Sequence, residues 1–202
     1  MAALFLLALA VFAGSTEAAF RIVGGSPTTI DKFPSIVQVD FWNIFINNWV
    51  QSCAASILTR TYVLSAAHCF EGWLYDPSWR RIRAGATFRH TGGVLAYVQR
   101  AYNHPSYGVA APLDGDITVV RLRDTLVYTP VIQQASIIGQ NYVIPDNLPV
   151  VHAGWGAISQ GGPASNELLD VTIFKINREL CAARYLTLPS PGFVTENMIC
   201  AG

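Results

Sequence analysis

Seven short runs of β-favouring residues, separated by clusters of Gly, Pro, Asn and Asp, place the strongest constraint on the fold of this 202-residue chain. Such spacing is typical of antiparallel barrels and sandwiches. One segment, Arg178 to Tyr185, has a helical pattern, and Asn177 can cap its start. We therefore expect an all-β protein with a single helix. The runs are Ile36 to Phe41, Cys53 to Leu58, Tyr62 to Ser65, Val94 to Arg100, Ile117 to Leu122, Val150 to Gly154 and Leu168 to Ile176.

The composition is that of a protein with a large apolar core. Half of the residues (51%) are hydrophobic, only 13% are charged, and the formal net charge is zero. Without a Lys/Arg run, the sequence argues against nucleic acid or a membrane surface as a partner. The length allows one large domain or two small ones. A turn-rich stretch between Asp124 and Gln134 predicts a boundary, with a first barrel over 22–128 and a second over 134–202.

The first residues have the pattern of a targeting segment. Residues 1–13 are apolar, and the small residues Ser15, Thr16 and Ala18 follow at positions that a signal peptidase reads. A membrane span needs about 20 apolar residues, which is more than this run provides. We therefore predict a signal peptide over 1–18 and a secreted, extracellular protein.

Four cysteines fit an exported chain, because an even number in an oxidising compartment suggests disulfides. Three pairings are possible, and proximity in sequence favours Cys53 with Cys69 and Cys181 with Cys200. Each such disulfide would stabilise the fold by about 3 kcal/mol. A zinc site is the alternative, and the absence of Cys-X2-Cys and His-X3-His spacings disfavours it. We expect no metal.

Five short motifs follow one another between residue 21 and residue 202. In this order they resemble the trypsin-like (chymotrypsin-family) serine proteases, with the character of an insect digestive trypsin. Five matches in one order are not expected by chance. The motifs are Arg21-Ile22-Val23-Gly24-Gly25, Ser65-Ala66-Ala67-His68-Cys69, Asp114-Gly115-Asp116-Ile117, Gly154-Trp155-Gly156 and Asn197-Met198-Ile199-Cys200-Ala201-Gly202.

The resemblance implies a fold of two six-stranded antiparallel Greek-key barrels, the second of them incomplete within these residues. It implies a secreted serine-type endopeptidase that hydrolyses peptide bonds through an acyl-enzyme and needs no cofactor. Residues 19–21 would be a short activation propeptide, and an activating trypsin-like protease would cut between Arg21 and Ile22. The protein is expected to be a monomer, and its expected partners are protein or peptide substrates and protease inhibitors. Its expected location is extracellular and includes a digestive lumen.

His68 and Asp116 are the candidate catalytic residues. A serine hydroxyl is a weak nucleophile that needs a base, and imidazole suits that task near neutral pH. The resemblance gives His68 this role, and it makes Asp116 the buried carboxylate that orients the ring and stabilises its cation. Asp114 is interpreted as a turn residue before Gly115. The alternative for His68 is a structural histidine beside a disulfide.

No residue of the sequence completes a Ser-His-Asp site. In the related proteases the serine follows the aspartate by about 90 residues, and no Gly-Asp-Ser-Gly-Gly occurs here. Ser26, Ser159 and Ser165 lie in other motifs. We therefore expect a fragment that lacks the nucleophile and the oxyanion hole and is inactive as written.

Two other functions are open. A non-catalytic serine protease homologue, acting as a binding or regulatory protein, would explain the lack of a nucleophile. Against it, His68, Asp116 and the activation motif are all intact. A secreted β-barrel lectin or ligand carrier would leave the five ordered motifs without explanation.

Overall fold

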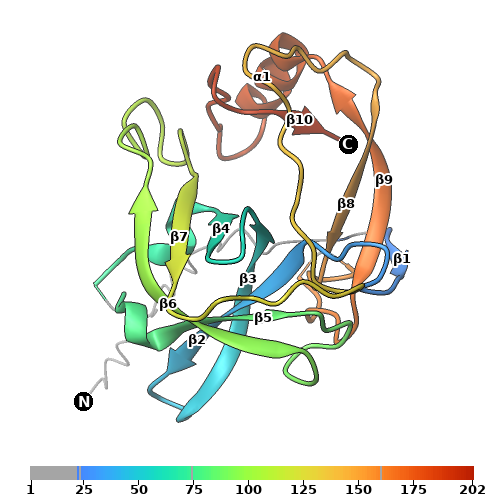
Figure 1. Cartoon of the computed structure of the whole chain (residues 1–202). Coiled ribbons are helices and arrows are strands. Elements are labelled where there is room, and N and C mark those ends of the chain that lie inside the picture. The colour runs from blue at the N-terminus through green and yellow to red at the C-terminus, as the bar shows by residue number, and fades with distance from the viewer. Residues whose placement is uncertain (1–21, 23, 74, 160) are drawn as a thin grey trace, which may run out of the picture.

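The computed structural model describes residues 22, 24–73, 75–159 and 161–202 (Figure 1). The predicted signal peptide over 1–18 and propeptide over 19–21 lie outside these residues. The described part is mostly β, as the sequence predicts, and it has a single α-helix. The elements are β1 (Ser26–Pro27), β2 (Ile36–Asn43), β3 (Asn48–Ile57), β4 (Tyr62–Ser65), η1 (Ala67–Phe70), η2 (Pro77–Trp79), β5 (Arg80–Ala84), β6 (Val94–Asn103), β7 (Thr118–Leu122), β8 (Pro149–Gly154), β9 (Leu169–Ile176), α1 (Arg178–Leu186) and β10 (Cys200–Ala201), where η1 and η2 are 3-10 helices.

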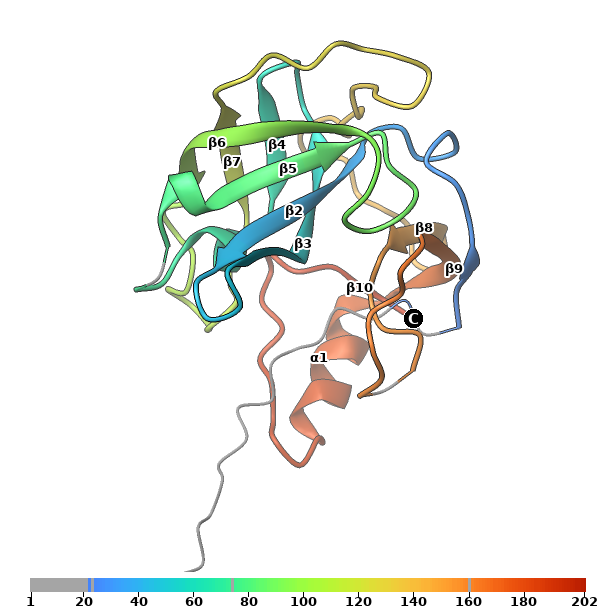
Figure 2. The ribbon, with the colours of Figure 1, turned by 90° about the horizontal axis from the view of Figure 1, so that it is seen from below.

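Six strands of the first half close into a barrel, which confirms the six-stranded antiparallel architecture predicted for this half (Figures 1 and 2). Their order is β2-β3-β4-β7-β6-β5, and all neighbouring strands are antiparallel. Buried and less buried residues alternate along β7, with the period of two expected of a strand that faces a core on one side. Every strand contributes a fully buried side chain to the core. These include Val37, Ile57, Val63, Ile82, Val98 and Val120.

The sequence predicts seven of these strands and misses β1, β5 and β10. Strand β5 is missed because three of its five residues are Arg, a composition that indicates exposure. In the structure Arg81 Nε lies 3.0 Å from Oδ2 of the buried Asp40, and Arg83 Nη1 donates to the carbonyl of Gly92 at 2.5 Å. These partners allow two guanidinium groups to lie in the barrel wall. Strands β1 and β10 are only two residues long, too short for any alternation to show.

A second antiparallel sheet, at the right of Figure 1, has four strands: β8, β9 and β10 from the second half of the chain, which also holds the helix, and β1 from its start. Strand β9 pairs with β1, β8 and β10. Asn177 caps α1 as predicted, because its Oδ1 accepts the backbone N–H of Leu180 at 3.0 Å. Among the described residues, no helix is long and apolar enough to cross a membrane. That this half is an incomplete barrel stays a prediction.

Residues 123–148 connect β7 to β8 and contain no helix or named strand. Two of their side chains, Leu126 and Ile132, are buried in the core of the barrel. A second, smaller core cluster lies between the barrel and the second sheet, because Ile36 of β2 packs against it. Its buried members are Ile30, Trp155 and Leu168. The domain limits, 22–128 and 134–202, stay a prediction.

Candidate active site

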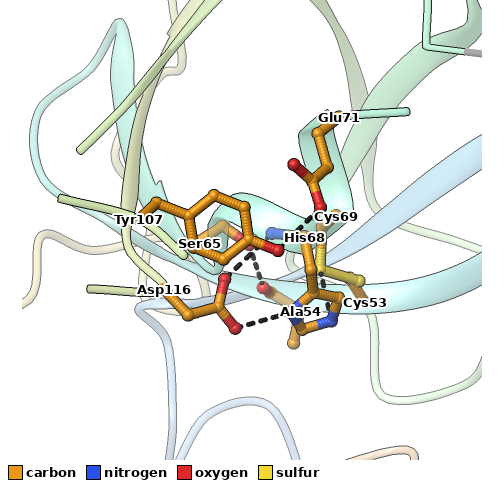
Figure 3. A network of polar contacts seen from close by, with 8 residues as sticks. All are labelled: Cys53, Ala54, Ser65, His68, Cys69, Glu71, Tyr107 and Asp116. Atoms are coloured by element: carbon orange, nitrogen blue, oxygen red, sulfur yellow. Dashed lines mark hydrogen bonds and ion pairs between the residues drawn. A yellow bond between two sulfur atoms is a disulfide. The ribbon is translucent and has the colours of Figure 1, made fainter. Parts of the chain in front are cut away.

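His68 lies on the short helix η1, shortly after β4 (Figure 3). Its neighbour Cys69 forms a disulfide with Cys53, which ties η1 to strand β3. Three residues before His68, the Oγ of Ser65 donates to the carbonyl of Ala54 at 2.8 Å. Both contacts attach this segment to β3, so the barrel holds the backbone of His68 in place.

Asp116 is presented by the loop of residues 104–117, which joins β6 to β7. Gly115, directly before it, has a φ of +62°, a conformation that favours glycine. A Cβ at this position would lie 2.5 Å from Ser106 Oγ, so the loop also lacks room for a side chain. The turn that points Asp116 toward His68 therefore depends on glycine at this position.

The structure brings His68 and Asp116 together through two hydrogen bonds, although 48 positions separate them in sequence (Figure 3). The ring Nδ1 of His68 lies 2.6 Å from Asp116 Oδ2, and the backbone N–H of His68 donates to Asp116 Oδ1 at 2.9 Å. The side chains are 31% and 17% exposed, respectively. Both carboxylate oxygens of Asp116 therefore bind the same residue, His68, at a site that is partly shielded from water.

This geometry fixes the tautomer of the neutral imidazole. An ionised carboxylate can only accept hydrogen bonds, so Nδ1 of His68 carries the proton. Nε2 then holds the lone pair and can accept a proton from a nucleophile. An ionised carboxylate at 2.6 Å from Nδ1 would stabilise the cation that such a transfer creates. The pair is therefore arranged to act as a general base and then as a general acid.

Tyr107 and Glu71 form a second contact between the two segments that carry this pair (Figure 3). Tyr107 belongs to the loop of Asp116, and its hydroxyl donates to Oε1 of Glu71, the residue after η1, at 2.6 Å. Burial raises the pKa of Tyr107, and the hydrogen bond to Glu71 and the charges of Glu71 and Asp116 raise it further. The phenol therefore keeps its proton, and this contact, into the alkaline range. The sequence analysis did not identify either residue.

Asp114 does lie in a turn, as interpreted from the sequence, but its side chain is buried and only 1% exposed. Its Oδ1 accepts a hydrogen bond from Thr195 Oγ1. The Nδ2 of Asn197 lies 3.1 Å from Oδ1 and 3.3 Å from Oδ2. The sequence analysis missed this contact, because an aspartate before a glycine carries the signal of a turn and nothing more.

One group of side chains in the described part of the chain has the spacing of metal ligands, namely Cys53, His68 and Cys69. Zinc binds cysteine as the thiolate. Both sulfurs of this group are joined in the disulfide, so neither is a thiolate. The group is therefore the anchor of the histidine and not a metal centre.

Comparison with known proteins connects this geometry with a family. The family model described as Trypsin matches residues 22–202. The chain belongs to the trypsin family. The match begins at Ile22, the residue that follows the predicted activation cut.

Two insect trypsins show how close the relationship is. Trypsin CFT-1 of Choristoneura fumiferana is 40% identical over 202 residues, and the alkaline trypsin C of Manduca sexta is 38% identical over 200 residues. Each alignment covers 99% of this chain and 76% of the relative. The chain is therefore a trypsin-like serine protease of insect type by descent, which confirms the resemblance drawn from the five motifs.

A solved structure shares the fold of this trypsin-family chain. It is that of the scabies mite inactivated protease paralogue S-D1, with a TM-score of 0.77 over 90% of this chain and 74% of that one. The two sequences are 21% identical, so the likeness concerns the fold alone.

The motif that contains the predicted activation cut is described from Ile22 onward, with the exception of residue 23, and Arg21 lies outside the described residues. Ile22 is 8% exposed, and its backbone N–H donates to the carbonyl of Ala157 at 3.1 Å. A side chain on Gly25 would collide with Cγ2 of Ile22, so the glycine of the motif makes room for it. The start of the family domain is thus packed against the second half of the chain.

Proposed function

We propose that this chain carries the general base and the orienting carboxylate of a secreted trypsin-like serine endopeptidase, His68 and Asp116 respectively. The observation that carries the proposal is the double hydrogen bond from His68 to Asp116, with 2.6 Å between Nδ1 and Oδ2. The relationship to insect trypsins supports the reaction, which is hydrolysis of peptide bonds through an acyl-enzyme.

In the proposed reaction, Nε2 of His68 takes the proton of a serine hydroxyl as its oxygen attacks the peptide carbonyl. The Nδ1–H of the imidazolium stays hydrogen-bonded to Asp116, and the imidazolium then donates its Nε2 proton to the leaving amine. A water molecule next attacks the acyl-enzyme with the same help, which frees the acid and the serine. Residues 1–202 contain no Gly-Asp-Ser-Gly-Gly. We therefore propose that these residues alone are inactive.

The same proposal gives roles to the first residues and to the partners. A trypsin-like protease cuts between Arg21 and Ile22 and removes residues 19–21 after the signal peptide over 1–18 has been cleaved. The start of the family match at Ile22 supports this cut. The substrates are proteins or peptides, protease inhibitors are further partners, and the enzyme works as a monomer outside the cell. Two disulfides in the described residues are consistent with export.

A role as a non-catalytic homologue has less support. A protein selected only for binding has no need for a partly shielded carboxylate that fixes the tautomer of a histidine. The two hydrogen bonds between His68 and Asp116 support the catalytic role instead.

A chimeric enzyme tests the proposal. The 202 residues are joined in register to the C-terminal part of Trypsin CFT-1, and the product is expected to hydrolyse an Arg-amide substrate after cleavage behind Arg21. In the chimera, His68→Ala should lower kcat by about 10⁶ and Asp116→Asn by about 10⁴, as in other proteases with this triad. His152→Ala, on β8, is the control and should retain activity. Undiminished hydrolysis by the His68→Ala chimera would refute the assigned roles.

A further inference from the structure

Asp114 is a buried carboxylate that the proposed mechanism does not use. It lies two residues before Asp116 and is 1% exposed. In the described part of the chain, no Lys or Arg forms an ion pair with it. Burial of a charge is costly unless hydrogen bonds compensate for it. The partners of Asp114 therefore indicate why a carboxylate is placed there.

Both side-chain partners of Asp114 come from the second half of the chain. They are Thr195 and Asn197, which lie 81 and 83 positions further along the sequence. Thr195 Oγ1 also accepts the backbone N–H of Asn197 at 3.3 Å, so the two partners are held together. Figure 2 shows the red segment before β10 reaching the barrel from the end of α1. The carboxylate thus fastens this segment to the loop that carries Asp116.

The backbone between Asp114 and Asp116 leaves little freedom. Asp114 N donates to Ala111 O, and Asp114 O accepts from Gly108 N, each at 2.9 Å. On the other side, Ile117 N donates to the carbonyl of Gly115 at 2.7 Å. Because the turn is short and hydrogen-bonded on both sides, a displacement of Asp114 also displaces Asp116.

We propose that Asp114 is a positioning residue: by binding Thr195 and Asn197, it fixes the turn that presents Asp116 to His68. The second half of the chain then helps to hold a catalytic pair that the first barrel carries. This inference rests on the proposed function, because that function makes His68 and Asp116 a catalytic pair. Its test, however, needs no enzymatic activity.

Hydrogen exchange of the His68 backbone amide reports the position of Asp116, because this amide donates to Asp116 Oδ1. The test compares the 202-residue chain with the double variant Thr195→Val/Asn197→Ala by NMR. The His68 amide should exchange about tenfold faster in the variant, which corresponds to about 1.4 kcal/mol, while the amide of Val120 in the barrel core should not change. A general loss of stability would instead accelerate both amides.

Two further variants sharpen the test. Glu196→Ala is the matched control, because Glu196 lies between the two partners and its side chain is 90% exposed. It should leave the exchange of His68 unchanged. Asp114→Ala should accelerate the exchange of His68 at least as much as the double variant does.

Unchanged His68 exchange in the double variant overturns the proposal, and so does equal acceleration at His68 and Val120. If Asp114→Ala does not fold, the double variant still decides, because it leaves the barrel sequence intact. An inactive chimera combined with selective acceleration at His68 would refute the proposed function and leave this inference standing.

Discussion

Trp155 donates its indole N–H to the backbone carbonyl of Thr87 at 2.7 Å and thereby joins the two halves of the chain. The same carbonyl accepts the N–H of Leu168 at 2.9 Å, and Thr87 Oγ1 accepts the N–H of Ile30 at 3.1 Å. Three segments that are distant in sequence thus meet at one residue. Because Trp155, Leu168 and Ile30 also form the small second core, polar and apolar contacts fix the same junction.

The first prediction concerns this junction. Trp155→Phe keeps most of the apolar contact but removes the donor, so it should lower the free energy of unfolding by about 1 kcal/mol. Trp155→Ala also leaves a cavity and should cost about 3–5 kcal/mol. Urea denaturation of the 202-residue chain measures both. Trp73→Phe, at a side chain that is 89% exposed, is the control and should change stability by less than about 0.5 kcal/mol. An equal effect of the two Phe substitutions would contradict the role of the hydrogen bond.

The second prediction concerns the disulfide beside His68. Replacement of Cys53 and Cys69 together by Ala should lower the free energy of unfolding by about 2–4 kcal/mol, because the unfolded chain gains freedom. Denaturant unfolding measures the loss, and a non-reducing digest should show Cys53 joined to Cys69 and Cys181 joined to Cys200. A Cys53–Cys181 link would contradict the topology around His68.

Most of the barrel could be predicted from local pattern, because its strands are short runs of β-favouring residues separated by turn residues. Strand β4 has the predicted bounds, Tyr62–Ser65, and the limits of β7 differ by one residue. Strand β5 could not be predicted, because its identity depends on where two guanidinium groups find partners. Asp40, the partner of Arg81, lies 41 positions earlier, and no local pattern contains that information.

In the candidate site, too, some features could be predicted from local sequence and others depend on contacts between distant residues. The motifs around His68 and Asp116 indicate the two residues and their roles, but the double hydrogen bond between them appears only when β4 and β7 lie side by side. Asp114 could not be distinguished from an ordinary turn residue, since its partners come from another part of the chain. The contact of Tyr107 with Glu71 likewise joins residues 36 positions apart.

The third prediction uses the raised pKa of Tyr107. Its pKa lies above the ordinary 10.0, so the folded chain binds this proton more tightly than the unfolded chain does. The stabilisation is complete below about pH 10 and is lost as the pH rises from there through the folded-state pKa. The stability advantage of the unmodified chain over Tyr107→Phe should therefore be constant up to about pH 9 and should shrink above about pH 10.

Urea unfolding at a series of pH values measures this advantage. Tyr142→Phe is the control, because the Tyr142 side chain is 59% exposed and lies outside the active-site network. An advantage over Tyr107→Phe that grows above about pH 10 would have the wrong sign and would contradict the tight binding of this proton.

The fourth prediction is that a polypeptide of residues 22–202 hydrolyses an Arg-amide substrate no faster than buffer does. Loss of the triad serine alone costs about 10⁶ in turnover in another serine protease, and what remains there comes from the oxyanion hole and from substrate binding. The resemblance assigns the oxyanion hole, like the nucleophile, to a segment outside these residues. His68 and Asp116 would then be a base and its partner without a hydroxyl to activate. Hydrolysis by this polypeptide that disappears on His68→Ala would show that one of its own groups serves as the nucleophile.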